Sequence, residues 1–168
     1  MIRAVLDANI FVSALIRPEG PPGQIFAELL EREAFRLILS IGIVDEVRRT
    51  LADPRVRRYV RLTSREIEAW LASMQSVAEV VEGRHSVSVV ASDPDDDKYF
   101  VAAVEGDADV VVSGDKHVLE VQQFEEDPKT VRRLPVGRWR ALRHRPVGQA
   151  GAGTRDSAEP MRSSKLVR

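Results

Sequence analysis

Short apolar segments alternate with segments of helical periodicity along most of the chain, and this alternation restricts the fold more than any other feature. Three segments are almost continuously apolar: Ile2–Leu6, Phe35–Leu39 and Ala108–Val112. Strands that are apolar on both faces belong to parallel sheets whose two faces are covered by helices. The sequence therefore predicts an α/β fold with a central parallel sheet.

The remaining elements follow from periodicity and from turn residues. A third strand is expected at residues 77–81 or at residues 87–90, and the pattern does not decide between them; a last strand is expected at residues 130–134. Helices are expected over residues 8–16, 24–33, 43–51, 63–78, 93–105 and 116–124. Thr63 and Glu66 form a capping box at the start of the fourth helix.

Composition limits the class of protein. The 168 residues fit one domain, and a content of 43% hydrophobic and 30% charged residues is typical of a globular chain. The net charge of -1 excludes a globally basic nucleic-acid binder, and the lack of cysteine excludes disulfides and cysteine zinc sites. No signal sequence and no apolar run of ~20 residues is found. We therefore expect a cytoplasmic protein without a membrane segment.

The chain changes character near its C-terminal end. Residues 148–168 are rich in Gly, Ala, Ser, Thr and charge, and they show almost no apolar pattern. Such a composition cannot bury enough surface to offset the entropy of ordering. We expect a folded domain over residues 1–145 and a flexible tail over residues 146–168.

Acidic residues follow the ends of the expected strands. Asp7 and Asp115 come just after apolar strands, and the acidic stretch 93–97 begins a helix at what should be the same edge of the sheet. Parallel sheets bind ligands at this edge, near the switch in strand order, and hard cations prefer oxygen ligands. Taken singly, each aspartate could instead cap its helix. Glu46 could likewise be a solvated side chain that pairs with Arg49 at i+3.

Four motifs in order carry a resemblance to a known family. They comprise residues 5–15 (VLDANIFVSAL), 43–47 (IVDEV), 93–103 (DPDDDKYFVAA) and 111–116 (VVSGDK). Together they resemble the motifs of the PIN-domain family, and the resemblance extends over about residues 1–142. The closest subgroup is the VapC-like toxin component of toxin–antitoxin systems.

The resemblance implies a PIN-like three-layer α/β/α fold with a central parallel sheet in the order 3-2-1-4-5. It also implies a ribonuclease that acts on single-stranded or loop RNA with Mg²⁺ or Mn²⁺, and whose acidic quartet is Asp7, Glu46, Asp96 and Asp115. Asp96 is preferred to Asp97 because Tyr99 and Ala103 then occupy the family's aromatic and small positions. Further supporting residues are Asn9, Ser113 and Asp97, and Asp97 is also the second choice as the ligand from this motif. Ala8 departs from the family, which more often has threonine there.

Phosphodiester hydrolysis explains why such a site needs several acids. Bound metal ions neutralise the phosphoryl charge, lower the pKa of water and stabilise the leaving oxygen. Mg²⁺ keeps several waters and uses few carboxylates for each ion. We expect Asp7, Asp96 and Asp115 to bind metal, and Glu46 to bind a second metal or to orient the attacking water. The products would carry a 5′-phosphate and a 3′-hydroxyl. The resemblance also implies a cognate antitoxin and a homodimer.

Arginines provide the expected RNA contacts, since phosphate contacts dominate nucleic-acid affinity. One group surrounds an aromatic residue and comprises Arg48, Arg49, Arg57, Arg58 and Tyr59, with Arg55, Arg61 and Arg65 nearby. A second group surrounds Trp139: Arg132, Arg133, Arg138, Arg140, Arg143 and Arg145. Either group could instead be a solvated surface or receive an acidic antitoxin peptide.

Other classes fit the sequence less well. A PIN-fold module that binds RNA or protein without cutting is the main alternative, and the complete acidic quartet argues against it. A phosphatase of the haloacid-dehalogenase type needs an Asp-x-Asp pair, whereas Asp7-Ala8-Asn9 lacks the second acid. A receiver domain needs its acids and phosphoacceptor on other strands.

Overall fold

The structure is a computed structural model that describes residues 1–85, 90, 93–120, 124–126, 129–136 and 138. Its strands are β1 (Arg3–Leu6), β2 (Arg36–Ser40), β3 (Glu79–Val81), β4 (Val110–Ser113), β5 (Phe124–Glu126) and β6 (Lys129–Pro135). Its helices are α1 (Ala8–Ile16), α2 (Pro21–Arg32), α3 (Ile41–Ala52), α4 (Pro54–Arg57), α5 (Ser64–Val77), α6 (Asp97–Glu105) and α7 (Lys116–Glu120). A 3₁₀ turn, η1 (Pro94–Asp96), precedes α6.

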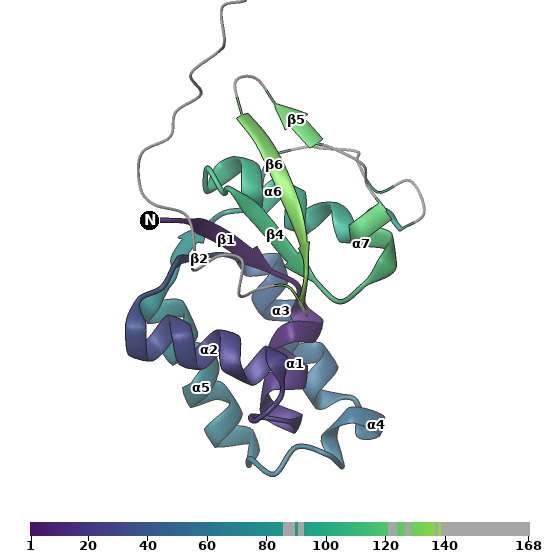
Figure 1. Ribbon diagram of the computed structural model, residues 1–168. Coiled ribbons are helices and arrows are strands. Elements are labelled where there is room, and N and C mark those ends of the chain that lie inside the picture. Colours follow the sequence, from purple (N-terminus) through teal and green to yellow (C-terminus); the bar gives the residue numbers. More distant parts are fainter. Residues whose placement is uncertain (86–89, 91–92, 121–123, 127–128, 137, 139–168) are drawn as a thin grey trace, which may run out of the picture.

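The sheet has the order β3-β2-β1-β4-β6-β5 (Figure 1). The strands from β3 to β6 pair in parallel, which confirms the predicted 3-2-1-4-5 order with β6 as the fifth strand. The short strand β5 pairs antiparallel with β6 and was not predicted: its first residue, Phe124, was assigned to the end of a helix, and Glu125 and Glu126 to no element. The third strand lies at residues 79–81, so the first of the two candidate segments is confirmed.

Strand order explains how helices reach both faces of the sheet. Crossover connections between parallel strands are right-handed. The chain moves in one direction from β1 through β2 to β3, and α6 then carries it back across to β4. Helix α6 packs against β1, β2 and β4. The switch in strand order therefore falls between β1 and β4, where the acidic residues were expected.

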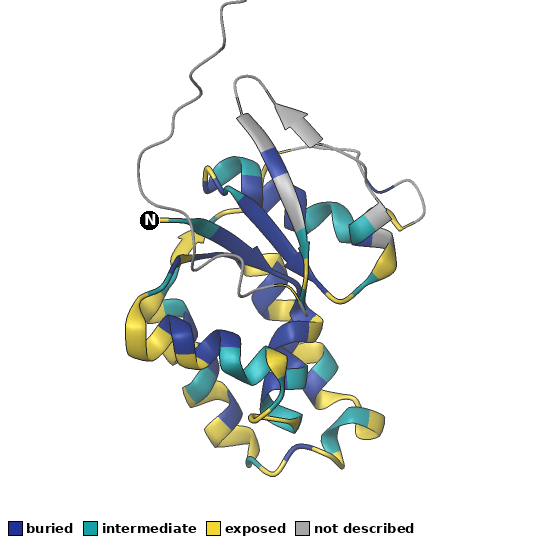
Figure 2. Cartoon of the chain, in the orientation of Figure 1, coloured by how far each residue is buried: buried dark blue, intermediate teal, exposed yellow. Residues whose placement is uncertain are grey.

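The core combines the central strands with an aromatic cluster under the helices. The residues of β1 and β4 are almost completely buried (Figure 2). Phe11 of α1 and Phe26 of α2 pack with their ring centroids 5.0 Å apart. The ring centroid of Trp70, on α5, lies 5.6 Å from that of Phe26. Thr63 and Glu66 make the predicted capping box at the start of α5.

Two proline-led helix starts differ from the sequence expectation. Helix α2 begins at Pro21, three residues before the expected start, and Pro54 begins the unexpected helix α4. Proline has no N–H to lose and a fixed φ at the first helical position, so in both places it begins a helix. The expected start of the second helix at residue 24 was therefore too late, and α4 was not predicted.

No helix in the part of the chain that the structure describes is long and apolar enough to cross a membrane. The expected boundary at residue 145, the tail 146–168, Trp139 and the arginines at positions 140, 143 and 145 lie outside the described residues.

Candidate active site

Asp7 lies directly after β1, at the carboxyl edge of the sheet. It is 1% exposed, and its Oδ1 caps α1 by accepting a hydrogen bond of 2.8 Å from the backbone N–H of Asn9. Leu6 pairs with Val112 in the sheet register, so the backbone N–H of Asp7 continues the ladder to the Val112 carbonyl at 3.0 Å. Burial raises the pKa of Asp7, which the hydrogen bonds from Ser113, Asn9 and Tyr99 partly offset.

Ser113 connects Asp7 to the residues that follow β4. Its hydroxyl donates to Asp7 Oδ2 at 2.5 Å and accepts a 2.8 Å bond from the backbone N–H of Asp115. Ser113 therefore links the Asp7 carboxylate to the backbone at Asp115. Asn9 also supports Asp7, but through its backbone, while its side chain is exposed.

Tyr99 joins Asp7 to Glu46. Its buried hydroxyl lies 2.7 Å from Glu46 Oε2 and 3.2 Å from Asp7 Oδ1, and it accepts from the backbone N–H of Ala8 at 3.3 Å. Burial raises the pKa of the Tyr99 hydroxyl, and the two carboxylates raise it further, so it stays protonated as a donor. Helix α3 and strand β1 are thus linked through one hydroxyl on α6.

Glu46 has a different ionic partner from the one that helical periodicity suggested. Lys98 Nζ lies 3.2 Å from Glu46 Oε2, and the two side chains are 23% and 28% exposed. Arg49, the expected i+3 partner, instead directs its Nε toward the backbone carbonyl of Asp45 at 3.4 Å. The alternative of a solvated Glu46 paired with Arg49 is therefore wrong.

The third-motif acids have distinct surroundings. Asp97 Oδ1 accepts a 2.7 Å hydrogen bond from the backbone N–H of Val90, and Asp93 caps η1 by accepting from the N–H of Asp95. Asp96 has a pKa raised to about 6 by partial burial and by the carboxylates of Asp93, Asp115 and Asp7, against a lowering effect of Lys98. Asp96 is thus the acid of this stretch that shares an electrostatic environment with Asp7 and Asp115.

The donor set fits a hard divalent cation. Burial is the main cause of the raised pKa of Asp7 and of Asp96, and neighbouring carboxylates raise both further, so a bound cation would offset an existing cost of ionisation. Among the described residues, no three carboxylate or histidine side chains are gathered closely enough to hold an ion directly. Mg²⁺ usually keeps several waters and takes only one or two carboxylates, so a water-rich ion suits this more open arrangement.

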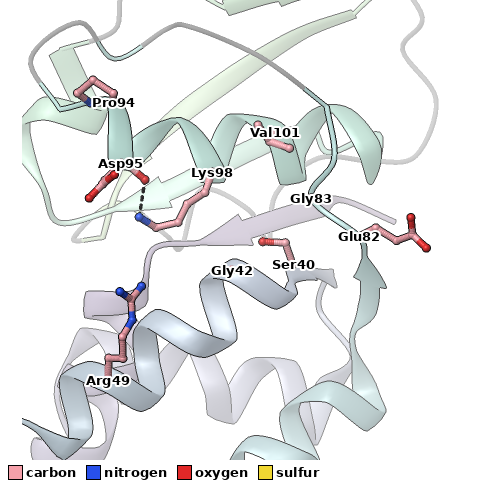
Figure 3. A pocket seen from close by; sticks show the side chains of 9 residues that line it. All are labelled: Ser40, Gly42, Arg49, Glu82, Gly83, Pro94, Asp95, Lys98 and Val101. Carbon is pink, nitrogen blue, oxygen red and sulfur yellow. Dashed lines mark hydrogen bonds between the residues drawn. The ribbon is translucent and has the colours of Figure 1, made fainter.

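Two clefts adjoin the acids. The acidic cleft has a volume of about 400 Å³ and is lined by Glu46, Arg49, Thr50, Asp53, Asp93, Asp95, Asp96 and Lys98. The side cleft, of about 410 Å³, is lined by Ser40, Gly42, Arg49, Glu82, Gly83, Pro94, Asp95, Lys98 and Val101 (Figure 3). Both lie between α3 and the segment η1–α6.

The arginines around Tyr59 differ in how they are bonded within the protein. Arg48 pairs with Asp45 and Glu68, and Arg57 donates to the carbonyls of Val60 and Leu62. These bonds stabilise the fold, so these two side chains fit the expected RNA-binding role poorly. Arg58 instead stacks over Tyr59, which is 56% exposed, with its guanidinium carbon 4.8 Å from the ring centroid.

Sequence reasoning missed the site roles of Tyr99 and Lys98. Tyr99 was treated only as an aromatic family position, although tyrosine at a buried helix position usually needs a partner for its hydroxyl. That requirement was the available signal. Lys98 offered no such signal, since a lysine beside acids usually lies at the surface.

The fold and the acidic edge define a class: a parallel α/β domain with carboxylates at its topological switch point. Comparison with known proteins gives the family. The family model described as PIN domain matches residues 3–117. The uncharacterized protein MJ1680 of Methanocaldococcus jannaschii is 31% identical over 121 residues, which are 72% of this chain and 76% of that protein. The chain belongs to the PIN domain family.

A solved structure supports the fold. A chain in the crystal structure of VapBC2 from Rickettsia felis, bound to a DNA fragment from its promoter, superposes with a TM-score of 0.50. The match covers 79% of this chain and 99% of that one at 10% sequence identity. At this identity the match shows the shared fold.

Proposed function

We propose that this chain is a metal-dependent endoribonuclease that cuts single-stranded or loop RNA and is the toxin of a toxin–antitoxin pair. The observations that support the proposal are the links of Asp7 to Glu46 and of Asp96 to Asp7 and Asp115. Tyr99 hydrogen-bonds both Asp7 and Glu46, and Asp96 has its pKa raised by Asp7 and Asp115. Membership of the PIN domain family supports the same reading.

The proposal assigns a role in metal binding or in water activation to each acid. Asp7, Asp96 and Asp115 would hold Mg²⁺ or Mn²⁺ in part through the waters of the ion, which when bound would neutralise phosphoryl charge and lower the pKa of water. Glu46 lines the acidic cleft and is held by Tyr99 and Lys98, so its carboxylate is positioned to orient an attacking water or to hold a second ion. Ser113 and Asn9 fix the orientation of Asp7.

Cleavage of RNA tests the proposal directly. The full chain should cut single-stranded RNA in Mg²⁺ or Mn²⁺, should stop in EDTA, and should leave 5′-phosphates. Asp7→Asn and Asp96→Asn should each abolish cleavage. The matched control is Asp45→Asn, since Asp45 lies next to Glu46 on α3 but pairs with Arg48. Retained cleavage in Asp7→Asn and Asp96→Asn would show that the site is elsewhere. No cleavage by the parent chain under any of these conditions would favour a non-catalytic PIN-fold binding module.

The proposed partners need separate measurements. An antitoxin would be the product of an adjacent gene, and it should co-purify with the full chain and inhibit cleavage. The expected homodimer would have twice the monomer mass in size-exclusion chromatography with light scattering. The R. felis complex supports an antitoxin partner by its fold likeness alone.

A further inference from the structure

Two cationic side chains from different helices meet where the two clefts join. Arg49 of α3 and Lys98 of α6 line both the acidic cleft and the side cleft. Figure 3 shows both side chains reaching into the space between the two helices. A chain-like ligand that runs from one cleft to the other would therefore pass both of them.

Arg49 differs from its neighbour Arg48 in how it is bonded. The guanidinium of Arg48 binds Asp45 at 2.7 Å and Glu68 at 2.9 Å. Arg49 has only the 3.4 Å contact from its Nε to the Asp45 carbonyl, and no carboxylate of the described residues lies within 4.0 Å of it. Its terminal nitrogens are thus available for an anion, and a guanidinium can bind phosphate through two donors at once.

Lys98 is held at the edge of the acidic centre. Its ammonium contacts Glu46 Oε2 at 3.2 Å and also donates to the backbone carbonyl of Asp95. An ammonium has three donors, and this one is 23% exposed on the cleft side. It can contact a phosphate while it stays close to Glu46.

The other charged residues that line the two clefts are acidic, so binding of an anion there depends on Arg49 and Lys98. The two clefts also carry six carboxylates, from Glu46, Asp53, Glu82, Asp93, Asp95 and Asp96. A polyanionic strand is repelled by such a lining unless cations lie along its path. Among the residues that line these clefts, Arg49 and Lys98 are the cations.

We propose that Arg49 and Lys98 form a phosphate clamp that holds single-stranded RNA across the groove between α3 and α6, beside the acidic quartet. The clamp rests on the proposed ribonuclease function and adds the path of the substrate to it. It also separates Arg49 from Arg48 and Arg57, whose charges are used within the fold.

Salt-dependent RNA binding tests the clamp. Full-length Asp7→Asn protein, which should bind RNA without cutting it, is titrated into a labelled single-stranded oligonucleotide of mixed sequence over a series of KCl concentrations. Each phosphate contact to a single strand contributes about 0.7 to the slope of log affinity against log salt. Adding Arg49→Gln or Lys98→Gln should therefore weaken binding and reduce the slope by about 0.7, and the double variant should lose about twice that.

Arg48→Gln is the matched control, because it removes an equal charge one residue away on the same exposed helix. The slope of log affinity against log salt for this variant should differ from the parent slope by less than roughly a third of the contribution of one phosphate contact. In the cleaving protein, Arg49→Gln should raise KM with little change in kcat, since it binds substrate away from the acids. Circular dichroism should show the same fold for all variants.

The possible results separate the two proposals. If the parent chain cuts RNA but Arg49→Gln and Lys98→Gln keep the parent slope, the clamp is wrong and the proposed function stands. An equal reduction of the slope in Arg48→Gln also overturns the clamp, because the effect would then arise from general surface charge. If the parent chain neither binds nor cuts RNA, both proposals fail.

Discussion

Replacing Asp96 with asparagine should stabilise the metal-free protein while it removes activity. The pKa of Asp96 is raised from its ordinary 3.8 to about 6 by partial burial and by neighbouring carboxylates. A folded-state pKa above the unfolded value means that the folded chain binds more protons between these two values. The free energy of unfolding therefore falls as pH rises from about 4 to about 6, and the full penalty is present above that range.

The magnitude follows from the size of the shift. About two pKa units correspond to about 3 kcal/mol. Asp96 is half-buried, and water screens part of that cost. We therefore expect Asp96→Asn to raise the free energy of unfolding by about 1–2 kcal/mol at neutral pH, and by almost nothing near pH 4.

Urea unfolding in EDTA, followed by circular dichroism at both pH values, measures this difference. Asp97→Ala is the opposing control, since it removes the bond to the Val90 N–H and should lower stability by about 1–3 kcal/mol. Adding Mg²⁺ should then stabilise the wild type, by about 2.7 kcal/mol at one hundred times its Kd, and should stabilise Asp96→Asn much less. An Asp96→Asn protein that is less stable than wild type at neutral pH, or a gain that is unchanged near pH 4, would refute the reasoning.

Three further predictions concern stability, each measured as the free energy of unfolding in urea. Tyr99→Phe should lower the free energy of unfolding by about 1–3 kcal/mol. It removes the hydroxyl that accepts from the Ala8 N–H and lies within hydrogen-bond distance of the Asp7 and Glu46 carboxylates. An unchanged unfolding midpoint would contradict this. Gly106→Ala should cost about 1–3 kcal/mol, since its Cβ would lie 2.3 Å from Ile38 Cγ2, whereas the Cβ of Gly42→Ala would make an ordinary contact of 3.9 Å with Ser40 Oγ and should be neutral or stabilising. Thr63→Ala should cost about 1 kcal/mol by removing the cap of α5, and Thr63→Ser should restore it.

The central fold could be predicted because its strands carry their signal in sequence. Strands β1 and β4 are buried on both faces, so nearly every residue in them is apolar. The edge strand β3 begins at an exposed glutamate and includes an exposed valine, so its pattern resembles a helix end. Periodicity could therefore offer residues 77–81 only as one of two candidates.

The candidate site shows a similar division. Asp7 and Asp115 could be predicted to converge because each follows a central parallel strand. The bonds of Tyr99 and Lys98 to Glu46 join helices that are about fifty residues apart, and no local pattern encodes such a pairing. The preference for Asp96 over Asp97 as a metal ligand came from the family spacing, and it remains a proposal. The bond from Val90 N–H gives Asp97 a structural role that sequence could not show.

The hydrogen bond between Ser113 and Asp7 joins residues 106 positions apart, and this separation has a consequence for protein synthesis. At roughly 5–20 residues per second, Asp7 is made about 5–20 seconds before the strand that orients it. During that interval β1 can pair with β2. The other edge of β1 and the carboxylate of Asp7 lack their partners until β4 has been made. The acidic centre therefore cannot assemble until nearly the whole domain has left the ribosome.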